Sequence, residues 1–216
     1  MPPHPKTSKE EILQVAAQLA DAEGLRGVGV RAIASRLDIS PGTIYNVVGD
    51  IDDLMLLVNE QTLIGLRNAL RAAIVPEREA LQNILAMASA YIDFVQGHSR
   101  RWSMVIEYSH ASDKPLPGWY DRRIEETVGT VEEVLRPMIP RARERQRVVA
   151  VLWAALEGFA SLTASRKLSH VVGDDPHALV KLFLLRFLGT FQPGAESDAA
   201  DHALKRPRGR RADARG

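Results

Sequence analysis

The segment VRAIASRLDISPGTIYN, residues 30–46, decides the expected fold. Its first half has the apolar spacing of a short helix over about 30–37. Ser40 is a preferred N-cap residue and Pro41 suits the first helical position, so a second short helix is expected over about 42–48. Two short helices joined by a turn of about three residues form a helix-turn-helix.

A helix-turn-helix binds DNA by placing its second helix in the major groove. The hydroxyls of Ser40 and Thr43 can donate to phosphate oxygens, and backbone amides at a helix start bind anions. Tyr45 and Asn46 are larger polar side chains that can reach base edges. The alternative is a helical hairpin without a role in DNA binding. The candidate DNA-binding residues are Arg31, Ser40, Pro41, Gly42, Thr43, Tyr45 and Asn46.

Helical spacing continues on both sides of this motif, and alternating strand-like runs are scarce. The fold class expected is all-α, with about nine helices. Besides the two helices above, the expected helices cover residues 9–23, 50–74, 77–96, 99–110, 117–136, 141–169 and 176–191. We expect a DNA-binding domain over 1–50 and a ligand-binding and dimerisation domain over 51–192. A disordered basic tail is expected over 193–216, because its composition lacks periodicity.

The formal net charge of +1 hides an asymmetry along the chain. The segment from Lys205 to Arg215 carries a net charge of +5, so the remainder carries −4. Near-neutrality excludes a broadly cationic nucleic-acid coat. We hypothesise that residues 205–211 add non-specific phosphate contacts, and the alternative is a tail that only aids solubility.

Cysteine is absent from the chain, which excludes disulfide scaffolds, cysteine-containing zinc sites and thiol catalysis. A cytoplasmic location is consistent with this absence. Residues 1–11 are polar, so no secretory signal is expected there. The longest apolar run, residues 148–156, is about half of the roughly 20 residues that a membrane span requires. We therefore expect no membrane partner, and we assign neither a metal site nor a cofactor.

A pattern of about 45 residues extends beyond the helix-turn-helix. It consists of Ile12, Leu13, Ala16, Gly24, Val30, Arg31, Ile33, Ala34, the run Ile39-Ser40-Pro41-Gly42-Thr43-Ile44-Tyr45, Asp53 and Leu54. With this spacing the chain resembles the TetR family of one-component transcriptional repressors. The resemblance implies a dimer that binds a pseudo-palindromic operator in double-stranded DNA and releases it when a small-molecule effector binds.

Four positions depart from that family's usual pattern. Gly29 stands where the family usually has a Ser or Thr cap, Val47 where it often has His, and Ile51 where it usually has Lys. Each missing group commonly touches a phosphate. Asp38 replaces the turn glycine, but Asp tolerates the left-handed conformation better than most residues.

The N-terminal 54 residues contain five basic and eight acidic side chains. Binding through bulk charge is therefore excluded, and affinity must come from local amides, hydroxyls, Arg31, Arg36 and dimerisation.

The family resemblance implies a dimer interface and an effector pocket in the C-terminal two-thirds. Small residues at turn-spaced positions near 141–169 independently favour close helix packing, and the last helix is strongly apolar. A four-helix bundle across a two-fold axis would bury both. A buried monomer core is the alternative. The interface residues expected are Ala150, Ala154, Gly158, Ser161, Leu179 and Phe183.

Aromatic and methionine side chains in the middle helices are candidates for a mostly apolar effector pocket. Each of them could equally be an ordinary core residue. The candidates are Met87, Tyr91, Phe94, Trp102, Ile106, Trp119, Tyr120, Ile124, Met138 and Trp153.

A second hypothesis is an all-helical metal-dependent enzyme. Glu107 and His110 form a Glu-x-x-His pair, which holds metal in di-iron bundles. Those sites need a second such pair, and the sequence has none. A phosphate-binding loop and a nucleophile elbow are also absent, so we expect no enzyme.

Overall fold

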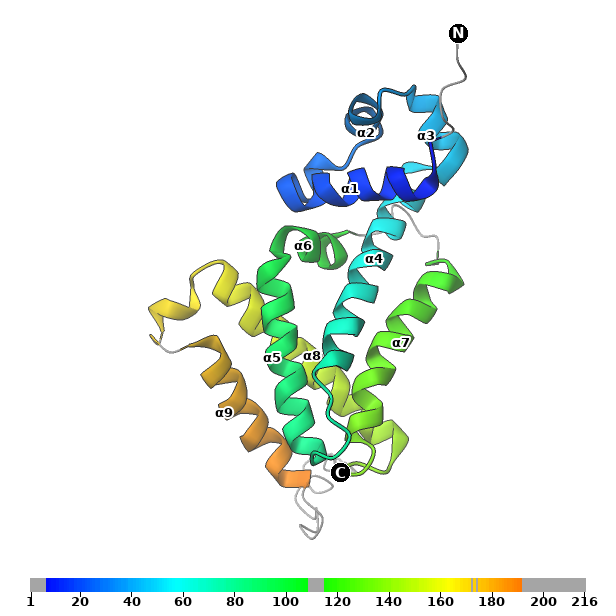
Figure 1. The fold of residues 1–216 in the computed structure, drawn as a ribbon. Helices are drawn as coiled ribbons and strands as arrows, with labels where there is room; N and C mark the ends of the chain where they lie inside the picture. Colours follow the sequence, from blue (N-terminus) through cyan, green and yellow to red (C-terminus); the bar gives the residue numbers. More distant parts are fainter. Residues whose placement is uncertain (1–6, 109–114, 172, 174, 192–216) are drawn as a thin grey trace, which may run out of the picture.

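The structure is a computed structural model that describes residues 7–108, 115–171, 173 and 175–191. Every regular element in these residues is helical, as predicted (Figure 1). The helices are α1 (Lys9–Glu23), α2 (Val30–Leu37), α3 (Pro41–Val48), α4 (Ile51–Ala72), α5 (Ala80–Gly97), α6 (Ser99–Glu107), α7 (Gly118–Leu135), α8 (Ala142–Ala164) and α9 (Pro176–Leu188), with short 3-10 turns at η1 (Gly24–Gly27), η2 (Leu168–His170) and η3 (Gly189–Phe191).

Local capping sets the starts of the N-terminal helices. Ser8 caps α1, and its Oγ accepts a hydrogen bond from the Glu11 amide at 3.1 Å. Asp50 caps α4, and the bonding is reciprocal: the Asp53 amide donates to the Asp50 Oδ1 at 2.8 Å, and the Asp50 amide donates to the Asp53 Oδ2 at 3.3 Å. Between α2 and α3, Asp38 has φ 52° and ψ 46°, so the left-handed turn is made without glycine. These features confirm the expected helix starts and the expected conformation of Asp38.

Several predicted boundaries differ from the structure by a few residues. The helix expected to continue to 169 ends at Ala164, because Arg166 has φ 56° and the Lys167 amide donates back to the Leu162 carbonyl at 2.9 Å. No glycine or proline marks this end in the sequence. The helix expected from 77 begins at Ala80, since the Asn83 side chain binds the backbone of Val75 at 2.9 and 3.0 Å and holds a turn there.

Two hydrophobic cores share α4. The N-terminal core is formed by α1, α2 and α3, and it is closed by Leu54, Met55 and Val58 of α4. The C-terminal core is formed by α5 to α9 and by residues of α4 such as Leu63 and Leu66. In Figure 1, α4 runs from the N-terminal bundle down into the C-terminal bundle. The same rigid helix therefore belongs to both halves of the molecule.

Met104 of α6 also belongs to the N-terminal core, although α6 lies far along the chain. Its side chain is fully buried, and its carbonyl accepts a hydrogen bond from the buried side chain of Asn59 at 3.4 Å. The N-terminal core therefore draws on residues well beyond position 50.

Helix α8 is long and apolar enough to cross a membrane by length and composition, with a mean hydropathy of 1.4 over 18 residues. In this fold it packs against α5, α7 and α9. The buried Arg145 near its start donates to the carbonyls of Ile139 and Pro140 and so anchors the turn from α7. Its other face carries exposed apolar side chains such as Val151 and Leu162.

Replacing Ile44 with Ala should lower the free energy of unfolding by about 2–5 kcal/mol, because this side chain is 0% exposed in the N-terminal core. Urea unfolding followed by circular dichroism measures the change. Tyr45, the next residue, is 49% exposed, so Tyr45→Ala should change stability by no more than about 0.5 kcal/mol. Equal losses in the two variants would contradict this assignment of the buried face of α3.

Candidate nucleic-acid interface

Helix α3 presents one buried and one exposed face. Ile44 and Val48 are buried and fix the helix to the N-terminal core. Tyr45 and Asn46 are exposed on the opposite side, and their side chains are available to a ligand. Residues four apart share a helix face, which accounts for this division.

The start of α3 is organised by two hydroxyls. The Ser40 Oγ accepts a hydrogen bond from the Thr43 amide at 3.2 Å and lies 3.0 Å from the Thr43 Oγ1. Pro41 and Gly42 are exposed between them, so the backbone of the first turn is open to solvent. Pro41 has no N–H and the Thr43 amide is bound by Ser40, so the Gly42 amide is the backbone donor of this turn that a phosphate oxygen could use. The structure thus places Ser40, Pro41, Gly42, Thr43, Tyr45 and Asn46 on one continuous element.

Arg31 lies in the first turn of α2 and is exposed. Gly29 precedes it as the N-cap and provides no side-chain cap. A Cβ at Gly29 would meet no atom within 4 Å. Packing therefore does not require glycine at this position, and a Ser or Thr side chain would fit.

Two of the departures from the family pattern are explained by packing. Val47 and Ile51 are half-buried and pack against the N-terminal core. The apolar side chains therefore extend the core at positions where a polar side chain would reach outward.

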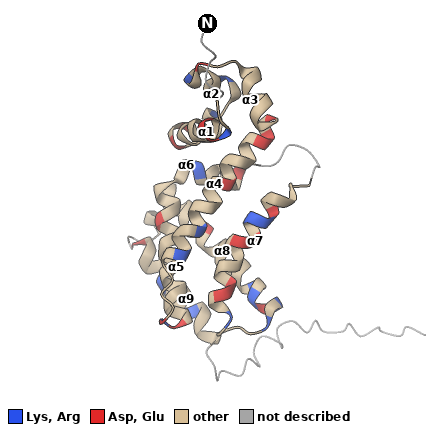
Figure 2. Ribbon diagram, turned by 45° about the vertical axis from the view of Figure 1, so that its right-hand side comes forward, with Lys and Arg blue, Asp and Glu red and all other residues tan. Residues whose placement is uncertain are grey.

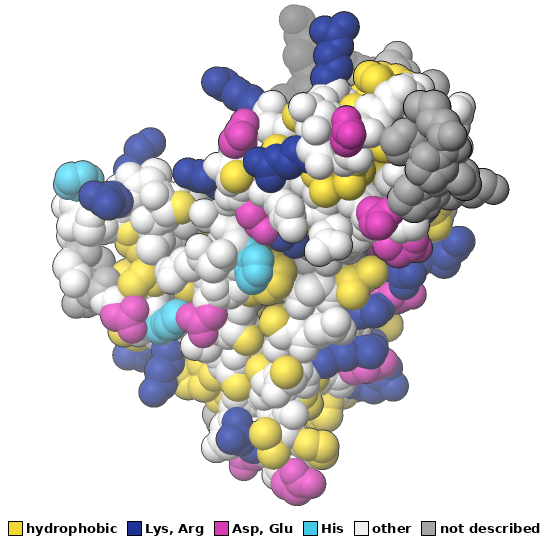
Figure 3. Space-filling view, turned by 45° about the horizontal axis from the view of Figure 1, so that its top comes forward, with side chains coloured by type: hydrophobic (Ala, Val, Ile, Leu, Met, Phe, Trp, Pro, Cys, Tyr) yellow, Lys and Arg dark blue, Asp and Glu magenta, His cyan; other side chains and the backbone are white. Residues whose placement is uncertain are grey.

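Charge is sparse and mixed around α3. The helix itself carries no charged residue, as Figure 2 shows. The N-terminal bundle displays both basic and acidic side chains on the face seen in Figure 3. Strong phosphate binding by charge alone is therefore not built into this surface, in agreement with the composition.

Helix α6 ties the C-terminal bundle to α1 by polar contacts that the sequence did not reveal. The Arg101 Nε donates to the Asp21 Oδ1 at 2.8 Å, and its Nη2 binds the other carboxylate oxygen. Arg100 donates to the Ala22 carbonyl near the end of α1. At the other end of α6 the Tyr108 hydroxyl donates to Asp52 of α4, and burial, followed by that hydrogen bond, raises the pKa of Tyr108.

An ion-pair chain joins α4 to α7. The Arg123 Nε donates to Glu60 at 2.6 Å and its Nη1 to Glu126 at 2.9 Å, while Arg67 also binds Glu126. The hydrogen bond to Glu60 is the first cause of the raised pKa of Arg123, and the hydrogen bond from Arg123 lowers the pKa of Glu126. These pairs fix the spacing of the two helices.

The predicted effector residues divide into two groups. Met87, Tyr91, Trp102 and Tyr120 are buried in the C-terminal core, and Phe94, Trp119 and Met138 pack against them. The remaining three, Ile106, Ile124 and Trp153, are exposed by 42%, 38% and 54%. Neither of the two cavities described below is lined by any of these residues.

Glu157 of α8 was missed, although it joins two of the predicted residues. Its Oε2 accepts hydrogen bonds from the Tyr91 hydroxyl at 2.7 Å and from the Trp102 Nε1 at 2.9 Å. The rings of Tyr91 and Trp102 meet edge to face, with centroids 5.7 Å apart. Burial, and then Glu157, raise the pKa of Tyr91 above its usual range. A carboxylate within an aromatic cluster follows no spacing rule, so no pattern along the chain indicates it.

The predicted interface residues lie on the outer faces of α8 and α9. Ala150, Ala154 and Ser161 are exposed, while Gly158, Leu179 and Phe183 are half-buried. Large apolar side chains surround them with high exposure, among them Val151 at 47%, Leu162 at 43%, Leu182 at 55% and Leu185 at 41%. The opposite faces of the two helices are buried in the C-terminal core. On α9 this face carries Val180, Leu184 and Leu188.

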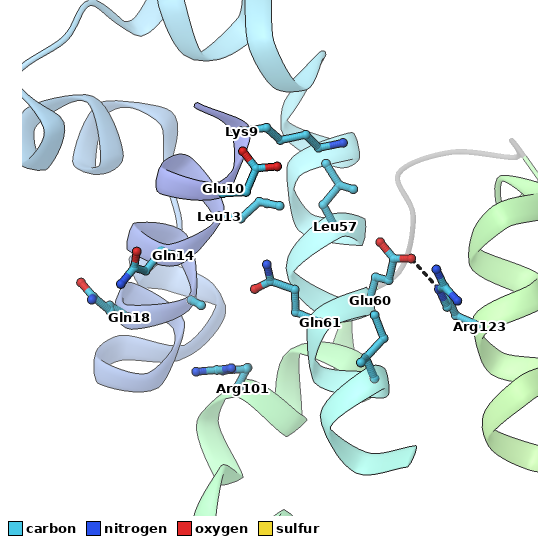
Figure 4. A pocket seen from close by; sticks show the side chains of 12 residues that line it. Lys9, Glu10, Leu13, Gln14, Gln18, Leu57, Glu60, Gln61, Arg101 and Arg123 are labelled. Atoms are coloured by element: carbon cyan, nitrogen blue, oxygen red, sulfur yellow. Dashed lines mark hydrogen bonds and ion pairs between the residues drawn. The ribbon is translucent and has the colours of Figure 1, made fainter. Parts of the chain in front are cut away.

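Two cavities stand out among the residues that the structure describes. A cavity of about 680 Å³ lies between α1, α4, α6 and α7 (Figure 4). A cavity of about 430 Å³ lies between α5 and α9. The sequence did not predict either, because each is lined by helices distant in the chain.

Other predicted features fall partly outside the described residues. Glu107 is exposed at the end of α6, whereas His110 is not described. Within the described ranges, no group of three or more His, Asp or Glu side chains could hold a metal ion. The basic segment 205–211 and the whole tail 193–216 also lie outside the described residues.

Replacing Glu157 with Ala should destabilise the protein by about 1–3 kcal/mol, because the Tyr91 and Trp102 donors would lose their acceptor. Glu157→Gln keeps an acceptor oxygen and should lose less. Urea unfolding followed by tryptophan fluorescence compares the two variants. Equal stability of the Ala and Gln variants would show that these hydrogen bonds do not stabilise the fold.

Two family descriptions match this chain. Residues 12–56 match "Bacterial regulatory proteins, tetR family", and residues 84–187 match "Tetracyclin repressor-like, C-terminal domain". The HTH-type transcriptional regulator YobS of Bacillus subtilis is 29% identical over 94 residues, which are 44% of this chain and 49% of YobS. The chain thus spans about half the length of that relative.

Solved structures share the fold at low identity. A TetR transcriptional regulator of Streptomyces coelicolor has a TM-score of 0.65 and 17% identity, over 87% of this chain and all of the other. BioQ, solved with its natural double-stranded DNA operator, has a TM-score of 0.62 and 16% identity, over 84% of this chain and 98% of BioQ. With both family descriptions matched in order along the helices of the described residues, the chain belongs to the TetR family of bacterial regulatory proteins.

Proposed function

We propose that this chain is a dimeric, ligand-responsive transcriptional regulator, a repressor that a small, mostly apolar effector releases from a pseudo-palindromic operator in the cytoplasm. The observation that carries the proposal is the exposed polar face of α3. It is anchored by the buried Ile44, and it displays Tyr45, Asn46 and an open first turn at Ser40–Thr43. This is the surface that a recognition helix needs in order to enter the major groove.

In this proposal Ser40 and Thr43 position the helix on phosphates, and Tyr45 and Asn46 contact base edges. Arg31 adds a phosphate contact from the start of α2. BioQ, whose fold is similar, binds a double-stranded operator, which supports DNA as the partner. Because charge around α3 is sparse, each protomer supplies few phosphate contacts, and two linked protomers are needed for useful affinity.

In this proposal the outer faces of α8 and α9 form the surface that binds the second protomer. Exposed Val151, Leu162, Leu182 and Leu185 would be buried in a four-helix bundle formed with the same helices of the partner. The small side chains of Ala150, Ala154 and Gly158 allow close approach of the two copies of α8. A two-fold axis here sets the spacing of the two α3 helices and hence of the operator half-sites.

An effector bound among α5, α6 and α8 would act through α6 and α4. Tyr91, Trp102 and Glu157 form a polar centre in that region, and Trp153 lies on the same helix as Glu157. Movement of α6 would be transmitted to α1 by the Arg101–Asp21 pair. Control of DNA binding requires that the effector bind the DNA-binding and the released arrangement of the helices with different affinities.

The variants Thr43→Ala and Tyr45→Ala should each weaken operator binding by about 1–3 kcal/mol, because each removes a DNA contact from the exposed face of α3. The operator is first selected from random DNA with the purified protein, and affinity is then measured by fluorescence anisotropy at constant salt. Asn68→Ala, an exposed change on α4, is the matched control and should bind like the unmodified protein. Near-normal affinity of both α3 variants would overturn this choice of recognition helix.

Leu182→Glu should convert the dimer to a monomer and abolish operator binding, since the side chain is 55% exposed in the protomer and would be buried across the interface. Sedimentation velocity measures the mass, and circular dichroism checks that the helices remain. Lys181→Glu, one residue away but outside the apolar cluster, is the control. A Leu182→Glu variant that stays dimeric would place the interface elsewhere.

A further inference from the structure

The cavity of about 680 Å³ lies at the junction of the two bundles and not within either core. One wall is α1 of the N-terminal bundle, and the other is α4, with Arg101 of α6 and Arg123 of α7 at its edges (Figure 4). Its volume is within the range of small-molecule sites. It is therefore separate from the aromatic region around Tyr91 and Glu157.

The lining combines an apolar surface with hydrogen-bonding groups that the fold does not use. Leu13 of α1 and Leu57 and Ile64 of α4 provide the apolar part. Gln18 of α1 and Gln61 of α4 are exposed, and their side chains make no hydrogen bond to another described residue. In Figure 4, the amide of Gln61 and the guanidinium of Arg101 both point toward α1.

The lining itself has a net charge of +1, and most of its charged groups are paired within the fold. Three cations, Lys9, Arg101 and Arg123, are present with two carboxylates, Glu10 and Glu60. Arg123 is held at both Nε and Nη1 by Glu60 and Glu126. Arg101 uses Nε and Nη2 for Asp21, and its Nη1 has no partner among the described residues. Two N–H groups of Arg101 are thus available beside Gln61.

We propose that this cavity is a second ligand site, which binds a small monocarboxylic acid with an apolar chain. The carboxylate accepts hydrogen bonds from the Nη1 of Arg101 and the amide of Gln61. The apolar chain lies on Leu13, Leu57 and Ile64, while the Arg123–Glu60 pair closes the α7 side.

Occupancy of this site links the two bundles directly. A ligand that touches both α1 and α4 binds best to one relative placement of the two, and α1 carries the helix-turn-helix with it. Ligand and operator then change each other's affinity by the same factor. This effect on DNA rests on the proposed function, whereas binding of the acid does not.

The first experiment is calorimetric titration of the full chain, without DNA, using octanoate, octan-1-ol and octylamine as probes of equal chain length. Octanoate should bind one per protomer and at least about tenfold more tightly than either of the other two. Equal binding of octanoate and octan-1-ol, tighter binding of octylamine, or no binding of octanoate would overturn the proposal.

Substitutions at Gln61 then locate the site. This residue is exposed, so Gln61→Glu and Gln61→Trp should fold normally. Gln61→Glu places a carboxylate beside Arg101, and Gln61→Trp puts a bulky ring where the ligand would lie, so each should weaken octanoate binding at least about tenfold. The same changes at Gln96, which is exposed on α5 and outside this lining, should leave the affinity for octanoate unchanged. Octanoate binding that survives both Gln61 variants would show that it binds elsewhere.

The second experiment measures operator affinity with and without saturating octanoate. A change in affinity that is lost in Gln61→Trp and kept in Gln96→Trp supports the coupling, and an unchanged affinity overturns it. Failure to bind any operator would refute the proposed function and leave the titration without DNA unaffected. The two failures are therefore distinguishable.

Discussion

The continuity of α4 is the constraint on which the rest of the structure depends. Its 22 residues extend for about 33 Å, and the capping box at Asp50 and Asp53 starts it directly after the Gly49 turn that ends α3. Leu54 and Val58 are fully buried in the N-terminal core, while Leu66 packs in the C-terminal one. Because one helix serves both cores, a change in its tilt cannot be confined to one of them.

The parts of the fold that depend on local chemistry were predictable from the sequence. The helix-turn-helix, its Ser40 cap and the left-handed Asp38 follow from neighbouring residues, and the structure confirms them. The end of α8 was placed five residues too late, since an arginine adopts the left-handed conformation there. The contacts of Arg101 with Asp21 join residues 80 apart, and no periodicity encodes such a pair.

The candidate site shows the same division. Tyr45 and Asn46 were predicted to contact DNA from their side-chain chemistry and their place in the second helix, and both are exposed in the structure. The absence of polar groups at Val47 and Ile51 was visible in the sequence, but their packing against the N-terminal core was not. Aromatic composition drew attention to Tyr91 and Trp102, yet it could not distinguish these buried side chains from the exposed Trp153 or find Glu157. Burial is a property of the packed bundle, not of one residue type.

The burial of Met104 has a consequence for attempts to build chimeric regulators. Exchanging residues 1–50 with those of a relative would leave this α6 side chain facing a foreign core. Arg101, which binds the carboxylate of Asp21, would lose its matched partner in the same exchange. A functional hybrid must therefore carry α6 together with the N-terminal helices, or be given a residue at position 104 that suits the new core. The unit of exchange is a discontinuous one.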